Sequence, residues 1–441
     1  MTTSSILPAG SLLRLKSLED SIAYKYSQDR IDQGLDQEGN DIEDPSMSQY
    51  ALDEQDHKAN FQWLLKLLSK LEETAPEEEE EEEQDENGNS VAVKEETAEE
   101  KAYRLEHELL TERVSSCMAH FCGRAAAGAM TRTWTFKTQP PKSLQIHDPS
   151  FTAGDVGFKT FGSAYLLSKH IAHGDIPQLE PFTSATTTAA TNSGLPLPRI
   201  LELGSGTGLT GFTAALYSNP QGPKVVLSDY HPNVLSTLKY TRELNHLEDR
   251  CDIQLLDWRD ALRRRKLRWN AWQSDQPESS SSQMEDAKDK KKERSTEYDN
   301  VDPTSQPADA AQTNPEQDSI EETPEQDRYD LILGAEVVYD HGHAELVAHV
   351  VDEYLKKDLI KPVHSSDDSS SVSSLPLSRR RPAFHIMFPI RKTHTDVIAD
   401  FDFWMEKMGL VDCREAKEWG REDGETKFMY HWREYVRKEH L

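Results

Sequence analysis

The stretch that decides the fold runs from Arg199 to Leu209 and reads Arg-Ile-Leu-Glu-Leu-Gly-Ser-Gly-Thr-Gly-Leu. Its first half is mostly apolar, as is typical of a buried parallel strand. Its second half has glycine at alternate positions, Gly204, Gly206 and Gly208, where the backbone can turn sharply and a ligand can touch it. The stretch predicts a strand that ends in a ligand-binding loop. The alternative is an ordinary tight turn from a strand to a helix.

The spacing of the glycines distinguishes between two kinds of nucleotide cofactor. A dinucleotide fingerprint has its third glycine three residues after the second, and Leu209 holds that place here. The loop therefore favours S-adenosylmethionine over a ligand that carries a pyrophosphate.

Acidic residues close the next two predicted strands. Lys224–Asp229 is an apolar run that ends in Asp229, and a carboxylate at that place can accept hydrogen bonds from both hydroxyls of a ribose. The third strand, Cys251–Trp258, ends in Asp257 and Trp258. This pair would offer an adenine one polar contact and a flat apolar surface. The alternative is that Trp258 only covers the core.

A fourth strand at Tyr329–Asp340 carries the turn Glu336-Val-Val-Tyr339, which we expect at the same edge of the sheet. Together with the glycine loop, Asp229 and the Asp257-Trp258 pair, this turn resembles the seven-strand protein-lysine methyltransferases, particularly the fungal branch that modifies translation elongation factors. The resemblance covers roughly Val156–Tyr435 and is interrupted by two insertions.

The resemblance implies an α/β fold with a Rossmann-like seven-strand sheet, mostly parallel, with a closing antiparallel hairpin. It implies S-adenosylmethionine as cofactor and a protein substrate, a translation elongation factor, whose lysine amine attacks the sulfonium methyl group without a metal. Glu336 would bind and orient the ammonium and Tyr339 would line the channel, both as catalytic residues. The implied cofactor-binding residues are Phe161, Glu202, Gly204, Ser205, Gly206, Gly208, Asp229, Asp257, Trp258 and Ala335.

Two positions depart from the family pattern. Relatives usually carry Asp-x-x-Tyr after the fourth strand, whereas this chain has Glu336, which keeps the charge but changes its reach. Many relatives have a tryptophan before the first strand, where this chain has Phe161. The departures bear on the substrate more than on the cofactor.

Other segments complete the predicted domain. They are a small amino-terminal hairpin around Thr133–Lys137 and Leu144–Ile146, a helix at Tyr165–Ile171, a helix at Pro232–Asn245, a fifth strand at Pro382–Arg391, a helix at Val397–Met408, and a closing hairpin of Leu410–Ala416 with Lys427–Tyr435. The alternation of strands and helices favours right-handed parallel crossovers.

The acidity of the chain is concentrated near its amino terminus. The net charge is −29, and the first hundred residues contain 8 Lys and Arg against 27 Asp and Glu. We interpret the unbroken run Glu77–Glu83 as a solvated linker, with a surface for a basic partner as the alternative; either disfavours nucleic acid as a substrate. Apolar residues at helical spacing predict two amphipathic helices, with stripes at Phe61, Leu64, Leu65, Leu68 and Leu71, and at Leu105, Leu109, Val114, Met118 and Phe121.

We therefore expect an acidic extension over residues 1–126 and a methyltransferase domain over residues 127–441. Two insertions, about 183–194 and 273–326, have too few apolar residues to offset the entropy of ordering and are predicted to be disordered. The basic run Arg263–Arg268 is interpreted as a solvated charged face, with a patch for nuclear import or an acidic partner as the alternative.

Four cysteines and the lack of a leading apolar segment predict a cytoplasmic protein that does not associate with membranes. We expect no metal at Cys117, His120 and Cys122, because they share a helical pattern and lack a second ligand pair. We expect a monomer. Two other functions stay open: a methyltransferase-like adaptor that works through its acidic tail, and a small-molecule methyltransferase.

Overall fold

A computed structural model describes residues 6–25, 54–76, 97–121, 128–138, 140–150, 157, 159–179, 198–217, 224–274, 322–359, 377, 381–422 and 426–441. The predicted insertion at 183–194, the acidic run Glu77–Glu83 and Cys122 lie outside these residues. None of the described helices is long and apolar enough to cross a bilayer.

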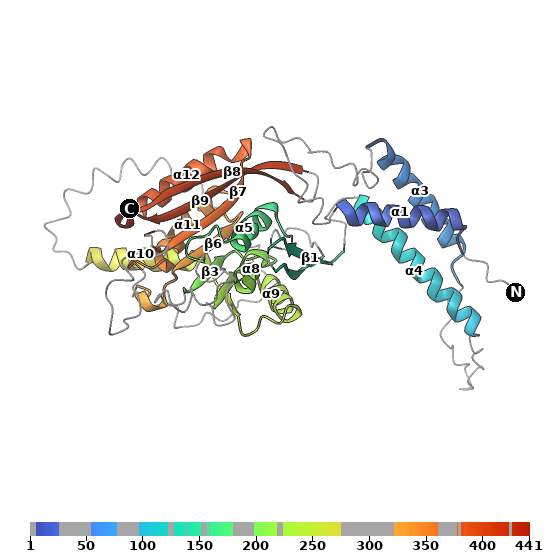
Figure 1. The fold of residues 1–441 in the computed structure, drawn as a ribbon, viewed down its shortest axis with the longest axis horizontal. Helices are drawn as coiled ribbons and strands as arrows, with labels where there is room; N and C mark the ends of the chain where they lie inside the picture. Colours follow the sequence, from blue (N-terminus) through green and yellow to red (C-terminus); the bar gives the residue numbers. More distant parts are fainter. Residues whose placement is uncertain are drawn as a thin grey trace.

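A seven-stranded sheet forms the centre of the larger part of the molecule (Figure 1). Its order is β5-β4-β3-β6-β7-β9-β8, in which β5 to β7 are parallel and β9 and β8 run antiparallel. This confirms the predicted fold class. The strands are β3 (Ile200–Leu203), β4 (Val225–Asp229), β5 (Cys251–Leu255), β6 (Leu331–Ala335), β7 (Ala383–Pro389), β8 (Leu410–Glu422) and β9 (Thr426–Arg437).

Helices cover both faces of the sheet, as parallel strands require (Figure 1). One face packs against α5 (Gly162–His173), α8 (Leu209–Tyr217) and α9 (Pro232–Leu244). The other packs against α10 (Trp258–Ser274), α11 (His341–Tyr354) and α12 (Thr395–Lys407). Short 3₁₀ turns lie at η7 (Glu325–Asp327), η9 (Lys392–His394) and η10 (Lys438–His440).

The predicted small hairpin is present as β1 (Met130–Phe136) and β2 (Lys142–Asp148). Trp134 and Phe136 are buried in the same apolar cluster as α5 and α8. At its end, the buried Asp148 pairs with Arg132 at 2.5 Å and accepts a hydrogen bond from Thr160 at 2.7 Å. The hairpin is thereby tied to the segment that leads into α5.

Three amino-terminal helices, α1 (Ala9–Lys25), α3 (Glu54–Glu73) and α4 (Ala98–Phe121), bury a separate apolar cluster. The sequence predicted only the last two. The stripe assigned to α4 is wrong in its first half, because Leu105 and Leu109 are exposed. The face that packs carries Leu110, Val114 and Cys117 instead.

The basic run lies on α10, and most of its charges pair with acids of α11. Arg265 lies 2.5 Å from Asp352, and Arg268 lies 2.5 Å from Glu353. Arg264, whose side chain is almost buried, reaches Glu353 at 3.7 Å. These ion pairs hold α10 against α11, so the basic run is not simply a solvated charged face.

The edges of the long predicted insertion belong to the folded domain. Gln273 and Ser274 end α10. On the far side, Glu322 pairs with Lys357 at 2.6 Å, and Glu325 accepts a hydrogen bond from the main chain of Lys357 at 2.9 Å. Residues 275–321 lie outside the described part of the chain.

Candidate functional site

A cavity of about 380 Å³ lies where β3, β4, β5 and β6 end at the carboxyl edge of the sheet. Strands of a parallel sheet bring their ends to one edge, so residues far apart in the sequence meet there. Eleven of the twelve predicted site residues line this cavity: Phe161, Glu202, Gly204, Ser205, Gly206, Asp229, Asp257, Trp258, Ala335, Glu336 and Tyr339.

The glycine loop follows β3 and forms the floor of the cavity. Gly204 has a φ of +56°, and a Cβ at that place would lie 3.1 Å from the Trp258 ring. The next residue, Ser205, donates its main-chain N–H to the carbonyl of Ser228 at 2.9 Å, which holds the loop against β4. Residue 204 must therefore be glycine both for its backbone angle and for the ring beside it.

Gly208 is the one predicted site residue that does not line the cavity. Its φ is +84°, and a Cβ there would lie 2.5 Å from Phe212 and 2.6 Å from Leu238. The position is needed for packing between α8 and α9. Its assignment to direct cofactor contact stays a prediction.

Asp229 closes β4, and its carboxylate holds two main-chain groups. One oxygen accepts from the N–H of Gly206 at 3.2 Å and the other from the N–H of His231 at 3.0 Å. Burial raises the pKa of Asp229, while these hydrogen bonds oppose the shift. Each carboxylate oxygen has two lone pairs, so both oxygens keep acceptor capacity for a ligand hydroxyl.

Asp257 and Trp258 form the wall after β5. Asp257 is paired with Arg259, whose Nη2 lies 2.6 Å away. Although burial alone would raise the pKa of Asp257, hydrogen bonds and the charge of Arg259 bring it below its usual value. A ligand amino group would therefore share this carboxylate with Arg259, a partner that sequence reasoning did not find.

Glu202 lies at the end of β3, buried yet in the cavity lining. Burial raises the pKa of this carboxyl to about 8, although Ser205, Thr210 and the main chain of Gly211 lower it. A buried acid that lines a cavity is stabilised in its charged form by a nearby cation. The ammonium and sulfonium groups of S-adenosylmethionine are such cations, so the lining fits this cofactor.

Glu336 lines the cavity from the end of β6, and its side chain is 7% exposed. Its carboxylate is already engaged: one oxygen lies 2.5 Å from Arg391, and the other accepts from the Ser163 hydroxyl at 3.1 Å. The prediction placed Glu336 at the edge of the sheet, where it is found. An incoming ammonium would meet a carboxylate held by two residues that the sequence did not indicate.

Tyr339 and His343 also line the cavity. Their rings lie 4.1 Å apart at an angle of 67°. Burial raises the pKa of Tyr339 to about 12 and lowers the pKa of His343. Both rings are therefore neutral near pH 7 and form an aromatic wall of the cavity. Trp258 belongs to the same wall, with its ring centroid 5.8 Å from that of His343.

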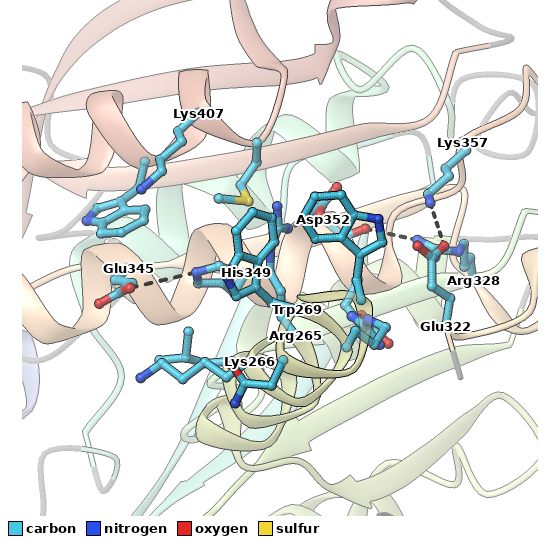
Figure 2. Close-up of a pocket in the computed structure, with 17 residues that line it drawn as sticks. Arg265, Lys266, Trp269, Glu322, Arg328, Glu345, His349, Asp352, Lys357 and Lys407 are labelled. Atoms are coloured by element: carbon cyan, nitrogen blue, oxygen red, sulfur yellow. Dashed lines mark hydrogen bonds and ion pairs between the residues drawn. The ribbon is translucent and has the colours of Figure 1, made fainter. Parts of the chain in front are cut away.

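A larger cavity, of about 780 Å³, lies on the helical layer formed by α10, α11 and α12 (Figure 2). Trp269 and Trp272 line it with ring centroids 5.1 Å apart. Ion pairs such as that of Glu322 with Lys357 join other residues of the lining. It contains neither the glycine loop nor any predicted site residue. The smaller cavity is the candidate site, because it gathers the strand ends.

Comparison with known proteins finds similarity over the segment that carries the glycine loop. Residues 139–272 match a family described as lysine methyltransferase, and this stretch contains the glycine loop, Asp229 and the Asp257-Trp258 pair. This segment therefore resembles a lysine methyltransferase domain. The chain is similar to protein-lysine N-methyltransferase EFM2 of Saccharomyces cerevisiae, with 29% identity over 38% of each chain. It is also similar to protein-lysine N-methyltransferase rrg1 of Schizosaccharomyces pombe, with 31% identity over 32% of this chain and 39% of the relative.

The matched segment thus spans about two fifths of the length of these curated relatives. Solved methyltransferase structures are more distant. Magnesium protoporphyrin IX methyltransferase from Synechocystis aligns with 62% of this chain and 79% of its own at 11% identity and a TM-score of 0.31. The TYW2 protein of M. jannaschii aligns with 69% and 86% at 12% identity and a TM-score of 0.32.

Proposed function

We propose that this chain is an S-adenosylmethionine-dependent protein-lysine N-methyltransferase. The observation that carries the proposal is one cavity that is lined both by the glycine loop and Asp229 and by Glu336 and Tyr339. It joins a surface suited to an adenosine and a methionine with an acid suited to a lysine side chain. The family of residues 139–272 supports the same activity.

The chain's own residues have distinct tasks in this proposal. S-adenosylmethionine would supply the methyl group on its sulfonium, and transfer would break the sulfur–carbon bond, form a nitrogen–carbon bond and leave S-adenosylhomocysteine. Gly204, Ser205 and Gly206 would contact the methionine part, and Asp229 would accept from the ribose. Asp257 and Trp258 would hold the adenine, while Glu202 would face the cationic groups.

The substrate lysine must arrive neutral at the reacting nitrogen. With a pKa of about 10.4 for a free lysine, removing its proton near pH 7 costs roughly 4 to 5 kcal/mol. Partial burial among Tyr339, His343 and Trp258 lowers that cost by disfavouring the ammonium. Glu336 would bind and align the ammonium as it enters, which replaces a chance encounter by a positioned one, and the ammonium would release its proton to water before its nitrogen attacks the methyl group.

We further propose that the substrate is a translation elongation factor and that the protein acts in the cytoplasm as a monomer. The support for the substrate is the resemblance of the glycine loop, the strand-end acids and the Glu336–Tyr339 turn to the fungal enzymes that modify such factors. The support for the compartment is the small number of cysteines.

The test is to incubate the purified protein with tritiated S-adenosylmethionine and a lysate from cells that lack this chain. A labelled protein band is expected, and acid hydrolysis of that band should release methylated lysine. Asp229→Ala, with its weakened cofactor site, should give little label. Label only in small molecules would instead favour a small-molecule methyltransferase, and no label despite cofactor binding would favour an adaptor.

A further inference from the structure

The backbone of Glu336 has a conformation that L-residues rarely adopt. Its φ is +55°, and among the described residues that are not glycine only His246 shares a positive φ. The main-chain N–H of Glu336 donates to the carbonyl of Met387 at 2.8 Å, which holds the residue against β7. Strained conformations of this kind persist where surrounding contacts enforce them, and they are frequent at functional sites.

Two side chains outside the cavity lining hold the Glu336 carboxylate. Arg391, just after β7, lies 2.5 Å from one oxygen, and Ser163, in the first turn of α5, donates to the other at 3.1 Å. Glu336 is part of the cavity lining, whereas Arg391 and Ser163 are not. Two residues outside the cavity lining thus fix the carboxylate of a residue that belongs to it.

A second ion pair stands next to the first. Glu422, at the end of β8, lies 2.8 Å from Lys159 and accepts from the main-chain N–H of Gly162 at 3.1 Å and from the Tyr430 hydroxyl at 3.2 Å. Burial and, after it, the charge of Glu422 raise the pKa of Glu336 to about 7, and Arg391 and Ser163 oppose that rise. The charged and titratable groups around Glu336 are thus Arg391, Glu422, Lys159 and Tyr430.

From this arrangement we infer that Arg391 is a positioning residue that acts through Glu336. It favours the charged form of the Glu336 carboxylate and holds it in place at the cavity, so that the ammonium of the substrate lysine meets a preformed acceptor. The inference rests on the proposed function. It adds to that function a residue that never touches the substrate or the cofactor.

The tests compare Arg391→Met, Arg391→Lys, Glu336→Gln and the double variant Arg391→Met/Glu336→Gln with the wild type. Lys392→Met is the matched control, because it removes one positive charge at the neighbouring exposed position. Two quantities are measured for each protein between pH 6.5 and 9. They are the affinity for S-adenosylmethionine and the rate of tritium transfer into the protein band that the wild type labels.

Arg391→Met should lower the transfer rate at pH 7 about fivefold, because loss of the guanidinium lets Glu336 take up a proton, and a rise of one unit from a pKa of about 7 takes the charged fraction at pH 7 from about one half to about one tenth. The deficit should shrink as the pH rises toward 9, since Glu336 then ionises without Arg391. Arg391→Lys should recover most of the rate, and Lys392→Met should behave as wild type. Cofactor affinity should be unchanged in all variants.

The double variant provides the decisive comparison. Without a charge at position 336, Arg391→Met should cause no further loss, because residues that act through one another are not additive. A loss that is the same at every pH, or that persists in the Glu336→Gln background, would overturn the inference and assign Arg391 a merely structural role. If the wild type binds cofactor but labels no protein, the proposed function fails as well. If the wild type labels a band and Arg391→Met does so equally, only the inference fails.

Discussion

The carboxylate of Asp229 accepts a hydrogen bond from the main-chain N–H of Gly206 at 3.2 Å. This contact joins the end of β4 to the glycine loop that follows β3. Asp229 therefore has two tasks, since it shapes the loop and also lines the cavity in which we place the ribose.

We predict that Asp229→Ala weakens S-adenosylmethionine binding by about 1.5 to 3 kcal/mol for each charged hydrogen bond lost. Asp229→Asn keeps an oxygen acceptor in the same place and should lose less. Isothermal titration calorimetry measures both. Equal affinities of wild type and Asp229→Ala would reject the assignment of Asp229 to the ribose.

Replacing the first and the third glycine of the loop should affect different properties of the protein. Gly204→Ala should abolish most cofactor binding, because its Cβ would approach Trp258 to 3.1 Å in the floor of the cavity. Gly208→Ala should mainly lower the free energy of unfolding, because its Cβ would meet Phe212 at 2.5 Å outside the cavity. Each substitution should also destabilise the protein by about 1 to 2 kcal/mol, because it places an L-residue at positive φ.

Denaturant titrations and cofactor binding, measured on both variants, separate the two effects. A Gly208→Ala protein as stable as wild type but unable to bind would restore a ligand role for Gly208.

Glu202 should make both stability and cofactor affinity depend on pH. Its pKa is raised to about 8 in the folded protein, so the folded state binds more protons than the unfolded chain above the ordinary pKa of a glutamate. The free energy of unfolding should therefore fall between about pH 4.5 and 8, and Glu202→Gln should remove this part of the slope. Affinity for the cationic cofactor should rise with pH over the upper part of the same range.

Thermal unfolding and calorimetry across that range provide the readouts for Glu202. A Glu202→Gln protein with the wild-type slope would show that another group titrates.

The part of the long insertion that can be removed should be shorter than its composition suggests. We expect the protein to fold and to bind cofactor when a short Gly/Ser linker replaces residues 275–321. Trp272 and Glu322, which flank this segment, line the same cavity, so a short linker should suffice to join them. A replacement that extends through residue 326 should be less stable, because Glu322 and Glu325 contact Lys357. Unfolding curves of the two deletions compare them directly. Equal stability would show that these contacts contribute little.

Most of the sheet could be predicted because its parallel strands are short, apolar and closed by glycine or acidic residues. The closing hairpin was predicted too short, since β8 continues to Glu422 through charged residues such as Lys417 and Glu418 that hide the alternation of a strand. Helix α10 was missed for a similar reason, because its arginines look solvated until Asp352 and Glu353 of α11 are beside them.

The site residues also divide into those that the sequence indicates and those that it does not. Residues at the ends of β3, β4, β5 and β6 could be named from the sequence, because one rule places all such ends at one edge. Arg391 follows β7 and was open to the same rule. Glu422 could not be found, since it arrives on an antiparallel strand whose register no local pattern reveals.

The most direct test of the account measures Glu336→Ala beside wild type in two assays, S-adenosylmethionine binding and transfer of tritium to lysine in the labelled protein. Glu336 lies outside the loop that we assign to the cofactor, so Glu336→Ala should bind the cofactor as wild type does and lose most transfer. Glu336→Asp should keep substantial transfer, because the carboxylate survives with a shorter reach. Wild-type transfer by Glu336→Ala would contradict the placement of Glu336 at the lysine, and cofactor binding without transfer by any of the three proteins would contradict the enzyme itself.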